Sequence, residues 1–138
     1  MKKIFLSILI AIAVLLPTIA VEAAYVHVPN FREMTSNRIQ ERIRFTGMEQ
    51  RSAGGVNYTR WNYICVDGKT SQYVNKYLKK LNSKHNISSV GSNGNNWYFV
   101  YSGSQAKYLN TFSGGFHIHV GVNGSNVVVD LVAGMYPK

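Results

Sequence analysis

Apolar and polar residues alternate most clearly near the C-terminus, in the segment GGFHIHVGVNGSNVVVDLVAG, residues 114–134. Every second residue on either side of the polar stretch NGSN is apolar, and this pattern predicts a β-hairpin with one buried face. His117, His119 and Asp130 fall on the opposite face. The predicted apolar face contains Phe116, Ile118, Val120, Val127, Val129 and Leu131.

The polar stretch allows two registers for this hairpin. A two-residue type I′ turn at Asn123-Gly124 matches the strongest short turn signal, and it places His117 opposite Asp130. A four-residue loop over 123–126 shifts the register by two positions and places His119 opposite Asp130. Both registers keep the apolar face intact, whereas a three-residue loop would expose half of it.

The segment DGKTSQYVNKYLKKLNSKHN, residues 67–86, has the spacing of an amphipathic helix. Thr70 or Ser71 is the predicted N-cap residue. Lysines 76, 79 and 80 fall outside the apolar stripe, so we expect them to face solvent. The stripe itself consists of Tyr73, Val74, Tyr77, Leu78 and Leu81.

The remaining patterns complete an α+β prediction. We expect an extended lead-in at 25–31, a short helix running into a strand at 35–45, a turn at 51–55 and a strand at 56–66. A polar loop at 88–96, a central strand at 97–102 and a short helix at 103–112 follow. The sequence therefore predicts a single small α+β domain over residues 24–138. Its sheet has four or five mostly antiparallel strands, with helices on one face and the C-terminal hairpin.

Residues 1–23 have the features of a secretory signal peptide. Lys2 and Lys3 precede an apolar run over 4–16, and Val21-Glu22-Ala23 provides a cleavage site. An uncleaved N-terminal anchor is the alternative. No cysteine lies at the end of the apolar run, where a lipoprotein signal would require one, so we expect no lipid attachment. We therefore expect an exported protein, periplasmic or extracellular, with no transmembrane segment after cleavage.

The basic charge of the chain narrows the class of partner. Fifteen Lys and Arg residues stand against six Asp and Glu, a formal net charge of +9. Outside the cytoplasm such a charge favours an anionic envelope polymer, an anionic lipid or a protein partner, and it makes nucleic acid a weaker candidate. With no clear catalytic motif, the composition favours a binding or accessory module, and we predict no cofactor.

Two enzymatic alternatives rest on the polar face of the hairpin. His117 and His119 would lie about 7 Å apart at their Cα atoms on one side of a strand, a spacing that allows both to bind a metal ion. Alternatively, Asp130 could orient His119 as a general base that activates Cys65. Cys65 is the only cysteine in the chain, and a buried, unreactive thiol is the default for such a residue.

The segment HVGVNGSNVVVD, residues 119–130, resembles the histidine strand and following hairpin of NlpC/P60-type cell-wall cysteine peptidases, which have a papain-like fold. This resemblance implies His119 as the base, Asp130 as the orienting residue and Cys65 as the nucleophile of a hydrolase. It covers the hairpin alone. The family's cysteine begins a helix in an Asp-Cys-Ser-Gly-type motif, whereas Cys65 lies near the end of a predicted strand.

Overall fold

The computed structural model describes residues 25–34 and 37–137, so the predicted signal peptide lies outside the described residues. A six-stranded antiparallel sheet has the order β2-β3-β7-β6-β5-β4. A separate parallel pair joins β1 to β8. Within the described ranges, no helix has the length and apolarity needed to span a membrane. The strands are β1 (Val26–Val28), β2 (Ile43–Ala53), β3 (Val56–Cys65), β4 (Ile87–Asn93), β5 (Asn96–Tyr101), β6 (Ile118–Asn123), β7 (Asn126–Val132) and β8 (Met135–Pro137).

Three hairpins and one helical connection build the main sheet. The β2–β3 hairpin is followed by helix α3 (Thr70–Asn82), which carries the chain from β3 to the β4–β5 hairpin at the far edge. The β6–β7 hairpin then fills the centre, between β3 and β5. The shorter helices are η1 (Phe31–Glu33), α2 (Asn37–Arg42) and η2 (Ala106–Tyr108).

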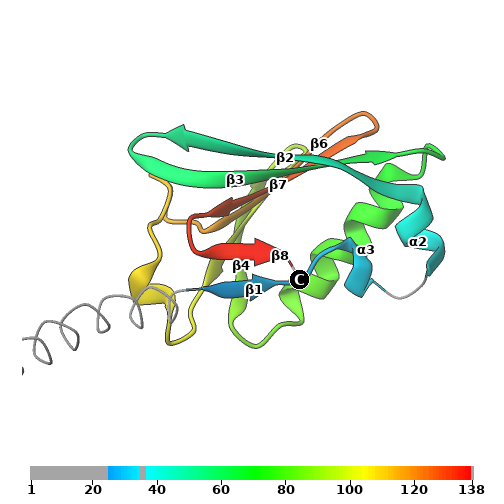
Figure 1. Cartoon of the computed structure of the whole chain (residues 1–138). Helices are drawn as coiled ribbons and strands as arrows, with labels where there is room; N and C mark the ends of the chain where they lie inside the picture. Colours follow the sequence, from blue (N-terminus) through cyan, green and yellow to red (C-terminus); the bar gives the residue numbers. More distant parts are fainter. Residues whose placement is uncertain (1–24, 35–36, 138) are drawn as a thin grey trace, which may run out of the picture.

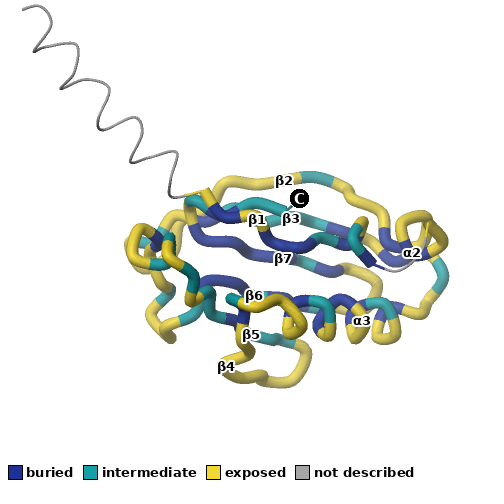
Figure 2. The backbone as a smooth tube through the Cα atoms, turned by 90° about the horizontal axis from the view of Figure 1, so that it is seen from below, coloured by how far each residue is buried: buried dark blue, intermediate teal, exposed yellow. Residues whose placement is uncertain are grey.

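Helix α3 and the β1–β8 pair lie on the same side of the sheet, which we call the inner face (Figure 1). Seen from that side, the buried residues run along β7, β6 and α3, while most of β2 and β4 is exposed (Figure 2). None of the described helices lies over the opposite, outer face (Figure 1). Because β2 and β4 are the two ends of the strand order, both edges of the sheet are free of further strand partners among the described residues.

The hydrophobic core fills the space between the inner face and α3. Phe31 joins these layers, since its ring stacks on Tyr77 of α3 with centroids 4.3 Å apart and meets Tyr63 of β3 edge-on at 4.8 Å. The buried hydroxyl of Tyr77 donates a hydrogen bond to the carbonyl oxygen of Pro29, 2.7 Å away. The segment that precedes α2 is therefore anchored to α3 by both packing and a hydrogen bond.

The structure confirms the α+β class and changes several details. The main sheet has six strands rather than four or five, because residues 87–93 form β4 where a polar loop was predicted over 88–96. The predicted helix over 103–112 is reduced to the single turn η2. Neither Thr70 nor Ser71 caps α3: its N-cap residue is Lys69, which makes no side-chain capping bond. The stripe over 73–81 is confirmed, with Val74, Tyr77, Leu78 and Leu81 buried.

The β6–β7 hairpin adopts the register of the four-residue loop. Asn123 pairs with Asn126, so the turn centres on Gly124-Ser125, and the predicted type I′ turn at Asn123-Gly124 is wrong. A type I′ turn needs positive φ at both central residues. Gly124 has a φ of 60°, but no non-glycine residue in the described ranges has a positive φ.

Candidate functional site

A row of polar side chains crosses the outer face of the sheet at its centre. Strand register places Arg60 of β3 beside Asp130 of β7, and Asp130 beside His119 of β6. Tyr98 of β5 is the next residue in the same row. Neighbouring residues on adjacent strands share a face, so the fold brings two of the predicted site residues, His119 and Asp130, into direct contact.

Asp130 is held by both of its neighbours. The Nε and Nη2 atoms of Arg60 donate to the two carboxylate oxygens at 2.8 and 3.0 Å, and His119 Nδ1 lies 2.8 Å from Oδ2. Burial opposes the charge of Asp130, but the hydrogen bonds from His119 and Arg60 outweigh it, so the pKa of Asp130 is lowered. Asp130 is only 4% exposed. This carboxylate is therefore a charged, fully paired element of the sheet.

The second ring nitrogen of His119 is also occupied. His119 Nε2 lies 2.8 Å from Oδ1 of Asn96 on β5. The ring lies over Gly121, where an added Cβ would come within 3.0 Å of His119 Cε1 and 3.3 Å of the Asn96 oxygen. With both nitrogens engaged, His119 joins Asp130 of β7 to Asn96 of β5, and with Arg60 the arrangement links four strands.

Aromatic rings cover one end of this outer row. Tyr98 stacks on His119 with ring centroids 5.2 Å apart, and Phe116 packs on Tyr98 at 4.8 Å. Phe112 stacks on Phe116 and also meets Tyr58 edge-on at 5.2 Å. The segment before β6 therefore shields part of the outer face, where none of the described helices lies.

His117 is separated from His119 in both position and role. It precedes β6, is 4% exposed, and its Nδ1 accepts the backbone N–H of Tyr101 at 3.1 Å. Burial lowers the pKa of His117, and its buried Nε2 has no hydrogen-bond partner among the described residues. In the described ranges, no group of three or more His, Cys, Asp or Glu residues is placed to hold a metal ion. The predicted pair His117 and His119 thus lacks a third protein ligand there.

The structure does not bring Cys65 to His119. Cys65 follows Tyr63 by two positions on β3, so its side chain is on the inner face, opposite to His119. The row that contains His119 crosses β3 at Arg60, five residues away, or about 17 Å along the strand. The Cys65 thiol is buried and donates instead to Asp67 Oδ1 at 3.3 Å.

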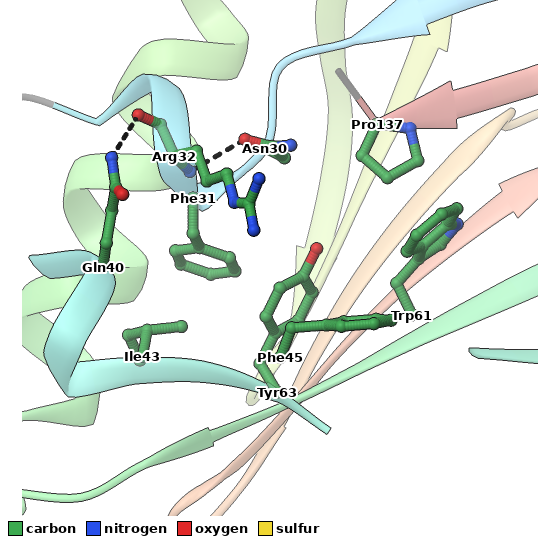
Figure 3. Close-up of a pocket in the computed structure, with 9 residues that line it drawn as sticks. All are labelled: Asn30, Phe31, Arg32, Gln40, Ile43, Phe45, Trp61, Tyr63 and Pro137. Carbon is green, nitrogen blue, oxygen red and sulfur yellow. Dashed lines mark hydrogen bonds between the residues drawn. The ribbon is translucent and has the colours of Figure 1, made fainter. Parts of the chain in front are cut away.

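A cavity of about 410 Å³ opens on the inner face near the β2 edge (Figure 3). Phe45 of β2 and Tyr63 and Trp61 of β3 form one side, and Arg32 lies across from them (Figure 3). Phe45 is 54% exposed although it is a large aromatic residue. The lining residues are Asn30, Phe31, Arg32, Gln40, Ile43, Phe45, Trp61, Tyr63 and Pro137.

The polar side chains of this cavity provide several hydrogen-bond donors and one positive charge. The hydroxyl of Tyr63 points toward the side where Arg32 lies (Figure 3), and burial raises the pKa of Tyr63 to about 12 while the positive charge of Arg32 opposes that shift. The indole N–H of Trp61 is buried without a partner among the described residues. None of the nine lining residues carries a carboxylate, and no ion pair of the described residues includes Arg32.

The local chain places Arg32 at this cavity through a short polar turn. Asn30 Oδ1 accepts the backbone N–H of Arg32 at 2.8 Å and caps η1. Gln40 Nε2 of α2 donates to the carbonyl oxygen of Arg32 at 3.0 Å. These two bonds hold the backbone of Arg32, while the buried ring of Phe31 anchors the turn in the core. Among the described residues, the guanidinium group of Arg32 has no ion-pair partner.

A second cavity, of about 490 Å³, lies between β1 and the start of β4, and His27 and His85 both line it. Its polar side chains are largely bonded to one another. The bonded pairs are His27 with Tyr136, Glu33 with Lys84 and Tyr101 with Gln105. It therefore offers fewer free groups than the cavity beside Arg32.

The cavity beside Arg32 was not predicted from the sequence. Arg32 is one of many scattered basic residues, and no local motif distinguishes it. The alternation of Ile43 and Phe45 with Arg42 and Arg44 does predict that Phe45 shares the apolar face of its strand. That face becomes a cavity wall because the segment that contains Arg32, more than ten residues earlier in the chain, packs against it.

Comparison with known proteins found no match to a family model, to a curated protein or to a solved structure.

Proposed function

We propose that this protein is an exported binding module that recognises a carboxylate or another anionic group of an envelope polymer, lipid or protein partner. The observation that carries the proposal is the cavity in which Arg32, the hydroxyl of Tyr63 and aromatic walls meet without any carboxylate. Ligand sites typically combine apolar walls with a few convergent polar groups. An arginine beside hydrogen-bond donors suits an anion in particular, because its planar guanidinium can donate two hydrogen bonds to one carboxylate.

The charge of the whole chain supports the same class of ligand. A formal net charge of +9 attracts anionic partners over a distance, and the cavity then supplies a defined contact. The hydrolase alternative gains no support from the described residues, because Cys65 and His119 lie on opposite faces of the sheet.

Tryptophan fluorescence provides a direct test, because the chain has two tryptophans and only Trp61 lines the cavity. A Trp97→Phe background isolates the signal of Trp61. Titration with poly-L-glutamate, with phosphatidylglycerol vesicles and with neutral dextran compares two anionic probes with an uncharged one. We expect a saturable change with at least one anionic probe and none with dextran.

Matched arginine variants then separate the cavity from general charge. Arg32→Gln removes the cavity charge, whereas Arg38→Gln removes one charge from the exposed face of α2. Loss of one charge-assisted hydrogen bond predicts a weakening of about tenfold for Arg32→Gln. Equal weakening by both variants, or no binding of either anionic probe at low ionic strength, would contradict the proposal.

A further inference from the structure

Strand β2 is a long and exposed edge of the sheet directly beside the cavity. It has eleven residues, and all but two of them are exposed. Among the described strands, β2 pairs only with β3. Edge strands of this length usually need protection, because their unpaired backbone groups can pair with another chain. A bulge between Phe45 and Gly47 is the main irregularity of β2.

The hydrogen-bond pattern shows which backbone groups of β2 point outward. The N–H of Val66 donates to the carbonyl oxygen of Arg42, whereas the N–H of Cys65 donates to Ser125 on the other side of β3. Because the two directions alternate along an antiparallel strand, Ile43 and Phe45 direct their N–H and C=O groups away from β3. After the bulge, Met48 is the register partner of Trp61. By the same alternation, its N–H and C=O groups also point away from β3.

The β2 residues whose backbone groups point away from β3 are also those whose side chains lie on the inner face of the sheet. Phe45 is the register partner of Tyr63 and Met48 that of Trp61, and both partners line the cavity or its rim. Phe45 is 54% and Met48 52% exposed. A strand that pairs with the outward groups of Phe45 and Met48 would place the side chains opposite them on the same face as the cavity.

We propose that the ligand of this cavity is an extended acidic segment of a protein partner, which pairs with the free edge of β2. Its backbone would bond to the outward groups of Phe45 and Met48, and an acidic side chain on the inner face would reach Arg32. This inference rests on the proposed function and names the class of partner. In such complexes the backbone bonds supply affinity and the pockets for alternate side chains supply specificity.

The charges along this edge favour an acidic segment over a neutral one. Arg32 lies in the cavity and Arg44 is exposed on the outer face of β2, and neither has an ion-pair partner in the described ranges. Glu49 is already paired with Arg51 at 3.3 Å. A polysaccharide or a lipid headgroup could satisfy Arg32, but neither supplies the alternating N–H and C=O groups that the β2 edge can bond.

Selection from a library of displayed random heptapeptides identifies a probe for this edge. We expect the selected peptides to share one acidic position within an apolar or β-branched alternating pattern, and to contain no central proline. The best selected peptide is then measured by isothermal titration calorimetry against the unaltered protein. Enrichment of peptides without an acidic position, or of no peptide, would contradict the inference.

Two independent measurements test the strand pairing itself. Met48→Pro removes an outward N–H without breaking a β2–β3 bond, and Ser92→Pro makes the matching change on the free edge of β4. We expect Met48→Pro to weaken peptide binding at least tenfold and Ser92→Pro to leave it unchanged. In the second measurement, N-methylation of alternate peptide amides should abolish binding for one set of amides and not for the other.

The outcomes also separate this inference from the proposed function. If Arg32→Gln weakens binding while neither Met48→Pro nor either N-methylated set does, the cavity function stands and the pairing with β2 is refuted. If Arg32→Gln has no effect on a peptide that pairs with β2, the proposed function fails. Light scattering tests whether a second copy of this chain occupies the free edge of β2 instead. A dimer that dissociates when the peptide is added would identify that second copy as the occupant and refute the inference.

Discussion

His119 and Asp130 are register partners on the two central strands of the outer face, with His119 Nδ1 2.8 Å from Asp130 Oδ2. Arg60 approaches the same carboxylate from β3, and Asn96 meets the other nitrogen of His119 from β5. A chain of side-chain hydrogen bonds thus runs across four strands. Because every member is paired, its physical role is to fix the alignment of the central strands.

Replacing Asp130 tests that role. Asp130→Asn removes the charge that pairs Arg60 and His119, and we expect the free energy of unfolding to fall by about 2 to 4 kcal/mol. The pKa of Asp130 is lower in the native state than its ordinary value. Its contribution is therefore complete above the unfolded pKa of about 3.9 and is lost as the pH falls through the native value.

Urea denaturation at pH 7 and pH 3 measures both effects. The wild type should lose more stability than Asp130→Asn between these two pH values. Equal losses in the two proteins would show that Asp130 is not the group responsible for the acid sensitivity.

Gly121→Ala tests whether the ring of His119 needs the space above β6. The added Cβ would lie 3.0 Å from His119 Cε1 and 3.1 Å from Val128 Cγ2, so the ring must move and its bond to Asn96 must lengthen. We expect a loss of about 1 to 3 kcal/mol and a shift of the His119 imidazole signals in NMR spectra. Gly47→Ala is the matched control, because nothing lies within 4 Å of its added Cβ. A loss of the same size in both variants would refute the crowding argument.

The sequence was sufficient for elements whose pattern depends on local burial. Alternation predicted the apolar face of the β6–β7 hairpin except for Phe116, which precedes β6 and packs on Tyr98 of the outer row. The helical stripe predicted α3, because in both cases one side of the element meets the core. Residues 88–96 have no such pattern. The edge strand β4 covers residues 87–93, and its one buried residue, Ile87, precedes this segment, so the segment's polar composition looks like that of a loop. The sheet pairing of its backbone, rather than its side chains, makes it a strand.

The His119–Asp130 contact and the cavity beside Arg32 also differ in how far the sequence predicts them. The contact between His119 and Asp130 followed from the alternation of side chains along the hairpin and from one of its two possible registers. Both features depend only on two neighbouring strands. The cavity depends on Arg32 meeting Tyr63 and Trp61, and that meeting is set by how the segment before α2 packs between α3 and the sheet. Such packing has no periodic signal in the sequence. The same applies to Cys65, whose distance from His119 depends on the position of β3 in the strand order.

Thiol labelling tests the placement of Cys65. Its side chain is buried on the inner face and bonded to Asp67, so we expect a chromogenic disulfide reagent to react with it only as the protein unfolds. Adding urea should accelerate labelling in parallel with unfolding. Ser89→Cys in a Cys65→Ala background places a thiol on the exposed edge strand β4 and should react within the mixing time. Fast labelling of native Cys65 would show that the thiol is accessible.

Tyr63 and Tyr77 allow the roles of stability and binding to be separated, because both contact the ring of Phe31. The hydroxyl of Tyr77 donates to the carbonyl oxygen of Pro29, and burial raises its pKa well above the ordinary value. Tyr77→Phe leaves that buried carbonyl without its donor, so we expect a loss of about 1 to 2 kcal/mol in urea denaturation.

Tyr63→Phe should have the opposite profile. The Tyr63 hydroxyl points into the cavity and has no protein hydrogen-bond partner among the described residues, so its removal should change stability by less than about 0.5 kcal/mol (Figure 3). Removal of a donor to a bound carboxylate should instead weaken poly-L-glutamate or peptide binding by about threefold to tenfold. Because the pKa of Tyr63 is about 12, the hydroxyl still donates at pH 10, and its contribution should persist there. A variant that loses stability but keeps its affinity would assign Tyr63 to the core rather than to the cavity.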